Sequence, residues 1–327
     1  MGVLKKIAII GFSREGKAVY QYLKRTPKFK KAEIWVLDQK KDIEIPRGIK
    51  TMLGPEYLSN LTQFNQIVRS PGVPFHKIRN LALEIRNLRI TSATKLFFKE
   101  CPCPIIGVTG TKGKGTTSTL IYQIFKNCGW DVYLAGNIGI PALNILPKLK
   151  KDSLVILEIS SFQLQDLTQS PSTAVILDIF PDHQDAHQNF REYIGAKVQI
   201  IKNQKPINKT IYFPDNKYSS WIANQSPGEK ISAQKDRFNF FAEKELQIPG
   251  HHNFKNAIAA FLVAQAHGCP TTTTLETIKK FRGLEHRLEL VQMRENIKYY
   301  NDSASTNPQT TIAAVQALKE PKILLAG

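Results

Sequence analysis

The stretch that decides the fold is Ile105-Ile106-Gly107-Val108-Thr109-Gly110-Thr111-Lys112-Gly113-Lys114-Gly115-Thr116-Thr117. An apolar run typical of a buried strand ends in a glycine-rich turn, and a lysine and hydroxyl residues then open a helical pattern. Glycines let backbone N–H groups surround an anion, and the start of a helix adds the positive end of its dipole. We therefore predict a nucleoside triphosphate site. The expected phosphate-binding residues are Gly110, Thr111, Lys112, Gly113, Lys114, Gly115, Thr116 and Thr117.

The match to the general phosphate-loop pattern is incomplete. The first glycine of G-x-x-x-x-G-K would fall on Val108, and Gly115 follows Lys114 in place of Ser or Thr. A metal-facing hydroxyl would therefore come from Thr116 or Thr117. The alternative is a glycine-rich turn that binds nothing. The complete order of strand, glycines, lysine, threonines and helix favours the nucleotide site.

Length and composition indicate a globular protein of two or three domains, with 327 residues, 42% hydrophobic and 22% charged. No run of 18 apolar residues predicts a membrane span. The N-terminal lysines precede a short apolar run that leads into a glycine turn, as in a first Rossmann-type strand rather than a signal peptide. We therefore expect a cytoplasmic protein. The four cysteines have neither zinc-site nor C-x-x-C spacing and are expected to be reduced thiols.

The formal net charge of +18 raises the question of a nucleic-acid partner. The lysines are scattered along the chain, and no aromatic and basic RNA-binding motif accompanies them. We therefore expect no nucleic-acid partner. The excess charge would instead attract anionic metabolites or reflect the composition of the host's proteins.

Residues 1–94 have the βαβ pattern of one nucleotide-binding half of a Rossmann-type fold. Strands are predicted at Ile7–Ile10 and Glu33–Leu37, with a helix over Ala18–Lys24 between them and Asp38 ending the second strand. The G-x-G-x-x-G fingerprint is incomplete, because Ser13 stands where the second glycine should be. A dehydrogenase is therefore disfavoured, whereas a nucleotide-sugar site needs fewer glycines. The turn Ser70-Pro71-Gly72 follows another strand, where ligands of such sheets bind.

In the central part of the chain, Glu158 lies near the end of the apolar strand Ser153–Ser161. A carboxylate in such a run is costly unless it meets a cation, and magnesium facing the phosphate loop is the natural partner. The alternative is a core acid in an ion pair. After another predicted strand, Ala174–Ile179, a loop with two histidines and two acids includes His183 and suggests metal or phosphate chemistry, with a structural histidine as the alternative.

Two predicted helices carry further candidates. Lys197 is the one lysine on the helix Tyr193–Ile201, and composition alone would place it at the surface. Asn253 and Asn256 are three residues apart at the start of an alanine-rich helix, so both amides could face one planar base. Helix capping by Asn253 is the alternative.

The last residues predict a helix to about Leu318 and then a buried strand over Lys322–Gly327 that reaches a glycine turn. A single helix followed by one strand is too small to bury its own apolar surface. We therefore expect a third domain that starts at residue 286 and is cut off.

Taken in order, these motifs resemble the Mur ligase family, ATP-dependent amide-bond ligases of peptidoglycan precursor synthesis. The resemblance is carried by Gly11–Gly16, Ser70-Pro71-Gly72, Gly110–Thr117, Gly136-Asn137-Ile138-Gly139, Leu157–Leu164, Asp182-His183, Ala196-Lys197, His252-Asn253 with Asn256, His286-Arg287 and Asn301–Asn307. The run Ser160–Leu164 after the acid favours the member that joins D-glutamate to UDP-N-acetylmuramoyl-L-alanine.

The resemblance implies an α/β fold with a UDP-sugar-binding Rossmann-like domain (1–94), a central P-loop ATPase-type domain (95–285) and the start of a Rossmann-like, amino-acid-binding domain (286–327). It implies a monomer that uses ATP and Mg²⁺ and forms an acyl phosphate. The implied substrate-binding residues are Ser13, Asp38, Ser70, Gly72, Asn137, Ser161 and Thr306.

The resemblance also implies roles in catalysis. Lys114 would bind the ATP phosphates, and the metal ligands would be Thr116, Glu158, His183 and Lys197, the last as a carbamylated lysine. Asn253 and Asn256 would face adenine, while Arg287 and Asp302 would hold ribose and phosphates.

The sequence departs from the family in two respects. Ala304 stands where many of these ligases carry lysine. By the resemblance we also expect most of the third domain, which supplies much of the D-glutamate site in the family, to be missing. Two alternatives follow. One is a sister ligase such as a folylpolyglutamate synthase, against which the N-terminal nucleotide-type domain argues. The other is a fragment that binds ATP and UDP-sugar without turnover.

Overall fold

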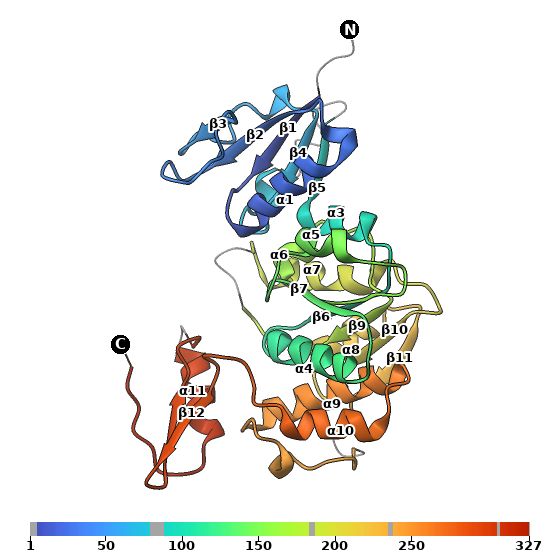
Figure 1. The fold of residues 1–327 in the computed structure, drawn as a ribbon, viewed down its shortest axis with the longest axis vertical. Helices are drawn as coiled ribbons and strands as arrows, with labels where there is room; N and C mark the ends of the chain where they lie inside the picture. The colour runs from blue at the N-terminus through green and yellow to red at the C-terminus, as the bar shows by residue number, and fades with distance from the viewer. Residues whose placement is uncertain (1–4, 79–87, 183–186, 235–237, 306–307, 327) are drawn as a thin grey trace.

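The computed structural model of the chain describes residues 5–78, 88–182, 187–234, 238–305 and 308–326. Two parallel sheets follow one another along the long axis of the molecule, and a smaller unit formed by the last residues lies to one side of the second, at the lower left of Figure 1.

The first sheet has the strand order β3-β2-β1-β4-β5, and every pair is parallel. Its strands are β1 (Lys6–Ile10), β2 (Glu33–Asp38), β3 (Lys50–Leu53), β4 (Gln66–Arg69) and β5 (Arg89–Ser92). Parallel strands covered on both faces read as continuous apolar runs, and the residues from Ile7 to Ile10 are fully buried. Short 3₁₀ turns are η1 (Pro27–Phe29), η2 (Leu61–Gln63) and η3 (Phe75–Lys77).

Helix α1 (Arg14–Arg25) begins four residues before the predicted start at Ala18. Gly16 lies inside its first turn, and a Cβ there would be 2.1 Å from the carbonyl oxygen of Gly11. The glycine therefore lets the helix start directly against the turn that follows β1, a close approach that apolar periodicity does not reveal.

The central sheet has the order β11-β10-β9-β6-β8-β7, again all parallel. Its strands are β6 (Ile105–Thr109), β7 (Val132–Gly136), β8 (Leu154–Glu158), β9 (Thr173–Ile176), β10 (Lys209–Tyr212) and β11 (Glu229–Ser232). The strand predicted at Ala174–Ile179 ends at Ile176, because its partner β6 turns away after Thr109, the residue paired with Ile176. Pairing of Val108 with Glu158 places the predicted acid beside the strand that enters the phosphate loop.

Helices cover both faces of the central sheet. Successive residues of β8 point to opposite sides, so that Ile156 joins one buried cluster and Leu157 the other. The first face packs against α4 (Lys114–Asn127), α9 (His251–Ala266) and α10 (Thr271–Lys280). The second packs against α3 (Ala93–Glu100), α5 (Ala142–Ile145), α6 (Ser161–Leu164), α7 (Phe190–Lys202) and α8 (Lys217–Ala223). Two 3₁₀ turns are η4 (Leu146–Lys148) and η6 (Glu243–Glu245).

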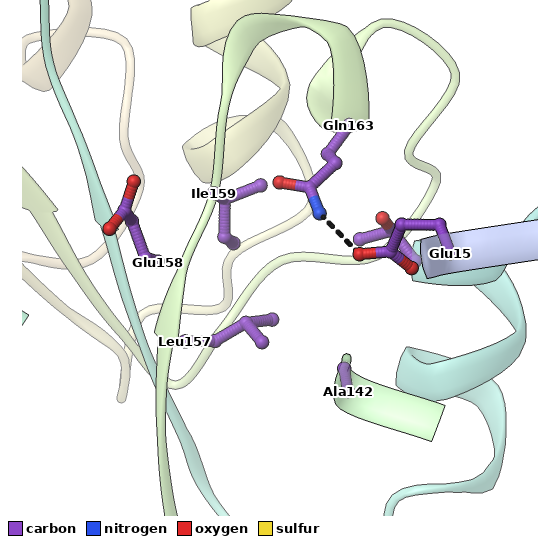
Figure 2. A pocket seen from close by; sticks show the side chains of 7 residues that line it. Glu15, Ala142, Leu157, Glu158, Ile159 and Gln163 are labelled. Carbon is purple, nitrogen blue, oxygen red and sulfur yellow. Dashed lines mark hydrogen bonds between the residues drawn. The ribbon is translucent and has the colours of Figure 1, made fainter. Parts of the chain in front are cut away.

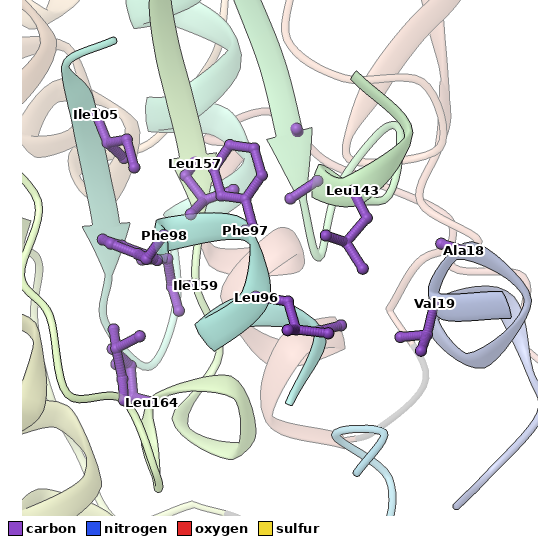
Figure 3. Close-up of a cluster of buried hydrophobic side chains, with 14 of the residues drawn as sticks. Ala18, Val19, Leu96, Phe97, Phe98, Ile105, Leu143, Leu157, Ile159 and Leu164 are labelled. Atoms are coloured by element: carbon purple, nitrogen blue, oxygen red, sulfur yellow. The ribbon is translucent and has the colours of Figure 1, made fainter. Parts of the chain in front are cut away.

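One buried apolar cluster runs across the predicted boundary at residue 94. Helix α3 contributes Leu96, Phe97 and Phe98 to this cluster (Figure 3). The same cluster contains Val19 of α1, which packs on the first sheet, and Leu157 of β8 in the central sheet. The two sheets therefore share a core.

The last unit consists of the antiparallel hairpin β12 (Glu289–Arg294) and β13 (Ile297–Asn301), followed by α11 (Pro308–Ala317). The strand predicted at Lys322–Gly327 is wrong over the described residues 322–326. These residues form no strand, and Leu325 is 92% exposed, because no neighbouring strand in the described part of the chain pairs with this apolar run.

None of the helices in the described ranges combines the length and apolarity that crossing a bilayer requires.

Candidate functional site

The phosphate loop joins β6 to the start of α4. Gly113 has φ of +81°, and a Cβ there would be 2.3 Å from Oδ1 of Asn256. A Cβ on Gly110 would be 2.6 Å from that of Leu177. Within the described ranges, the amide N–H groups of Lys112 and Gly113 find no acceptor. Glycine is thus required at both positions, and the loop presents backbone donors at a helix start, as an anion site needs.

Thr111 holds the loop in place. Its hydroxyl bonds to the hydroxyl of Tyr193 at 2.8 Å and to the carbonyl of Phe180 at 3.1 Å, and its amide donates to the carbonyl of Asp178 at 2.9 Å. These partners give Thr111 a structural part in the loop, and its predicted phosphate contact stays a prediction.

Two lysine ammonium groups converge on the carbonyl oxygen of Gly110. Lys114 Nζ donates to it at 3.1 Å and to Thr111 O at 2.9 Å, and Lys197 Nζ donates to it at 2.8 Å. Burial lowers the pKa of Lys114, an effect that the Glu158 carboxylate opposes. Burial, together with the charge of Lys114, holds the pKa of Lys197 well below its ordinary value.

Lys197 is 1% exposed, so the surface position expected from composition alone is wrong. Helix α7 packs this face beneath the phosphate loop, and the ammonium also lies over the ring of Tyr193, 4.7 Å from its centroid. A lowered pKa favours the neutral amine of a lysine, which is the form that reacts with CO₂ to give a carbamate.

Glu158 ends β8 and faces the start of α4. Its Oε1 accepts a hydrogen bond from Asn137 Nδ2 at 3.0 Å, and a Cβ on Gly115 would lie 3.4 Å from its Oε2. Figure 2 shows its carboxylate on the opposite side of the strand from Ile159 and Gln163. The bonded partner is thus an amide rather than the cation of a core ion pair. The Glu158 carboxylate acts on the pKa of Lys114, whereas the predicted roles of the two groups at phosphate and metal stay predictions.

The donor atoms around Glu158 fit a magnesium ion shared with phosphates. The described residues contain no group of three or more His, Cys, Asp or Glu side chains that could hold a metal. Thr116 is half-buried in the first turn of α4, and the buried hydroxyl of Thr117 has no hydrogen-bond partner among the described residues. Mg²⁺ is commonly bound through one or two carboxylates with substrate phosphates and water. Glu158 and these hydroxyls suit that arrangement, in which the protein supplies few ligands.

The predicted histidine loop lies largely beyond the described residues, including His183. Its second histidine, His187, is buried, accepts or donates a hydrogen bond with Ser161 Oγ at 2.9 Å, and stacks on Phe162 with ring centroids 5.1 Å apart. For His187 these contacts agree with the structural alternative. They also engage the hydroxyl of Ser161, whose predicted substrate contact stays a prediction.

The two asparagines of α9 lie beside the phosphate loop. Gly250 is the N-cap, so the capping alternative for Asn253 is wrong. Asn253 Nδ2 instead donates to Pro249 O at 2.7 Å, and Asn256 Nδ2 donates to Asn253 Oδ1 at 3.3 Å. Asn256 lies against Gly113 of the phosphate loop, and the predicted contact of the two amides with adenine stays a prediction.

A lysine that sequence reasoning missed fixes α9 to the sheet. Lys255 Nζ bonds to both oxygens of Asp178 at 2.7 and 2.8 Å, and to Asp215 at 3.0 Å. Asp178 follows a buried strand much as Glu158 does, and that shared position could have drawn attention to it.

The segment after α10 approaches the loop from another side. Leu284 Cδ1 lies 3.2 Å from where a Cβ of Gly115 would be, and the exposed Arg287 contributes to lowering the pKa of Lys114. Asp302 Oδ1 accepts the amide of Leu288 at 2.8 Å. Arg287 and Asp302 therefore stay candidates for nucleotide binding, whereas Thr306 lies outside the described residues.

Four of the predicted substrate-binding residues lie at the carboxyl edge of the first sheet. Asp38 accepts the amides of Phe12 at 2.7 Å and Lys40 at 2.9 Å. Ser70 is buried and donates its hydroxyl to Gly11 O at 2.6 Å, so this hydroxyl orders the turn. The other two, Ser13 at the N-cap of α1 and Gly72, are exposed at the same edge.

Sequence reasoning also missed two residues next to Ser13. Arg14 donates to Asn137 O at 2.7 Å, and Glu15 Oε1 accepts from Gln163 Nε2 at 3.3 Å (Figure 2). Both cross from the first turn of α1 to the central sheet, and their position in the first glycine turn was the available clue.

Comparisons with known proteins agree with this arrangement. Residues 108–264 match the model of the Mur ligase middle domain. UDP-N-acetylmuramoylalanine--D-glutamate ligase of Acetivibrio thermocellus is 33% identical, and the match covers 99% of this chain and 74% of the relative. The ligase of the same name from Clostridium tetani is 32% identical, with 99% and 75% covered.

Solved structures support the fold. MurC from Thermotoga maritima superposes with a TM-score of 0.56 at 17% identity, covering 95% of this chain and 77% of that one. MurF from Acinetobacter baumannii gives 0.58 at 18% identity, covering 72% and 61%. Sequence identity over nearly the whole chain and the shared α/β fold lead to one conclusion: the chain belongs to the Mur ligase family, the ATP-dependent ligases of peptidoglycan precursor synthesis.

Proposed function

We propose that this chain joins D-glutamate to UDP-N-acetylmuramoyl-L-alanine at the expense of ATP. Residues 1–94 would hold the UDP-sugar, residues 95–285 the ATP, and residues 286–327 would begin the amino-acid-binding domain. The observation that carries the proposal is the hydrogen bond between Asn137, the expected sugar contact, and Glu158, which faces the first turn of the helix after the phosphate loop. Acceptor and nucleotide would therefore meet at one edge of the central sheet.

The proposed reaction begins when the alanine carboxylate attacks the γ-phosphorus of ATP and ADP leaves. The amine of D-glutamate then displaces phosphate from the acyl phosphate and forms the amide. Lys114 would release its carbonyl partners and bind the phosphates, which stabilises the charge that develops there. Glu158 and Thr116 would hold one Mg²⁺ and His183 a second, with carbamylated Lys197 as a further metal-facing acid, and the bound metal would neutralise phosphate charge.

The test is phosphate release by the chain supplied with UDP-N-acetylmuramoyl-L-alanine, ATP, Mg²⁺ and D-glutamate. We expect release that depends on all of them, with the amide product identified by mass spectrometry. Turnover with glycine or lysine in place of D-glutamate would instead identify a sister ligase. Binding of ATP and UDP-sugar without turnover would identify a binding-only fragment.

Lys114→Ala separates the nucleotide site from the rest of the proposal. Loss of a charged partner for the phosphates should weaken ATP binding by about tenfold to a hundredfold, measured by calorimetry. Lys126→Ala, at the exposed far end of α4, is the matched control and should leave the affinity unchanged. Equal affinity of wild type and Lys114→Ala would remove the phosphate-loop assignment.

A further inference from the structure

Arg14 reaches from the first helix of the N-terminal sheet to a loop of the central sheet. It is the first residue of α1 and follows Ser13 directly. Its Nη2 donates to Asn137 O at 2.7 Å and, more weakly, to Gly136 O at 3.4 Å, and Nη1 donates to Gly139 O at 3.3 Å. A planar guanidinium can hold several acceptors in one geometry, which a lysine cannot.

The loop that Arg14 holds is itself closely joined to Glu158. Asn137 donates its amide N–H to Glu158 O at 3.1 Å and its side-chain Nδ2 to Glu158 Oε1 at 3.0 Å. A Cβ on Gly136 would be 2.2 Å from Glu158 O, so the loop lies directly on the acid. A displacement of this loop would therefore displace the hydrogen-bond partner of Glu158.

Glu15, the next residue, makes a second contact of the same kind. It accepts from Gln163 Nε2 at 3.3 Å, while Gln163 Oε1 accepts the amide of Ser160 at 3.0 Å (Figure 2). Adjacent residues of α1 thus hold the loop after β7 and the segment after β8. These are the two strands between whose ends Asn137 and Glu158 meet.

We propose that Arg14 is a positioning residue for the nucleotide site: through Asn137 it holds Glu158 toward the phosphate loop, and it thereby links the UDP-sugar-binding sheet to ATP binding. The inference rests on the function proposed above. It assigns a role in ATP binding to a residue of helix α1, which packs on the N-terminal sheet and begins beside Ser13, an expected contact of the UDP-sugar.

The test measures MgATP affinity of the full chain by calorimetry without any acceptor. Arg14→Ala should weaken the affinity about tenfold, the effect of losing one charge-assisted hydrogen-bonded contact. Arg14→Lys keeps one donor for Asn137 O but cannot hold the three carbonyls in one geometry, so it should recover only part of the loss. Arg25→Ala is the matched control. Arg25 lies on the same helix and donates to Leu143 O of α5, which carries no expected site residue, so the MgATP affinity should not change.

The outcomes distinguish the two proposals. If wild type fails to bind MgATP, both the proposed function and this inference fail. If wild type binds and Arg14→Ala binds equally well, only the inference fails. An equal loss of MgATP affinity in Arg25→Ala would mean that any contact between α1 and the central domain has this effect, and would also overturn the inference.

Turnover gives a second measurement that a purely structural role would not produce. Arg14→Ala should raise KM for ATP, while KM for the UDP-sugar stays within about twofold, because the guanidinium is bound to the central loop rather than aimed at the acceptor. A rise in KM for the UDP-sugar alone would contradict the positioning role. Thermal unfolding of each variant verifies that the fold is intact.

Discussion

Two glycines with the same backbone conformation differ in what surrounds them. Gly113 and Gly129 both have φ of +81°, but a Cβ on Gly129 would meet nothing within 4 Å, whereas on Gly113 it would collide with Asn256. Alanine at either position should cost about 1 kcal/mol of stability through the left-handed backbone. Gly113→Ala alone should also weaken ATP binding, by about tenfold or more, because Asn256 and the loop must move apart.

Calorimetric ATP titrations and thermal melts of the two variants test this prediction. Gly129→Ala serves as the control for backbone strain. A similar loss of ATP affinity in both variants would show that strain, rather than the contact with Asn256, controls the site.

Residues differ in how far the sequence alone could place them. Lys114 closely follows the apolar strand β6 and Glu158 ends its parallel neighbour β8, so local pattern was enough to predict that both lie at one edge of the central sheet. The burial of Lys197 depends on which face of α7 packs under the phosphate loop, and its carbonyl partner is 87 residues away. Arg14 was missed for the same reason, because its partners lie more than a hundred residues along the chain.

At the scale of elements, a buried ion pair joins β4 to the segment after α6. Arg69 Nη2 bonds to Asp166 at 3.0 Å, with both side chains almost fully buried, and also donates to Phe162 O at 2.7 Å. Asp166→Ala would leave the guanidinium buried without its counter-charge and should lower the free energy of unfolding by about 3–5 kcal/mol.

Thermal and urea unfolding measure the effect of Asp166→Ala. Lys17→Ala breaks the exposed pair of Lys17 with Glu44 and should leave the free energy of unfolding essentially unchanged. A small loss for Asp166→Ala, similar to that of this control, would mean that water or other groups compensate Arg69.

His267, which follows α9, gives the packing of α4 and α9 a pH dependence. Its Nε2 bonds to Thr173 Oγ1 at 2.9 Å, its ring packs on Phe125, and burial lowers its pKa from 6.5 to about 4. Between these values the unfolded chain binds more protons, so stability falls as pH falls from 6.5 and is level above it. By pH 4.5 this group should have removed about 2–3 kcal/mol.

The variant His267→Gln tests this prediction, since it keeps a donor for Thr173 without the titration. Urea unfolding at pH 7 and pH 4.5 should show a smaller acid loss in the variant than in wild type, by the amount just given. Identical losses would place the acid sensitivity in other groups.

Most strands of both sheets could be predicted, because parallel strands covered on two faces appear as short apolar runs ending in glycine or an acid. The same rule gave a wrong strand at Lys322–Gly327. An apolar run forms a strand only where neighbours pair with it, and the described residues offer none there. The apolar pattern of a segment thus indicates that it can form a strand, whereas the presence of a neighbouring strand decides whether the strand forms.

At the scale of the whole molecule, the terminal hairpin is largely exposed, because most residues of β12 and β13 face solvent. Val291, Met293 and Ile297 are more than half exposed, and Arg294 lies beside the turn. Trypsin should therefore cut after Arg294 or Lys298 several-fold faster than after Lys126 on α4. Mass spectrometry of early digests identifies the fragments. First cuts within α4 or α9 would contradict this order of local stability.

The core that α3 places between the sheets has a consequence for dissecting the protein. A gene split at the predicted boundary after residue 94 would leave Leu96, Phe97 and Phe98 on the second half without the side chains of α1 that cover them. The side chains of α1 in the first half would in turn lose their packing against α3. Neither half expressed separately should therefore fold into a soluble protein. A shortened chain that folds must keep both sheets on one polypeptide.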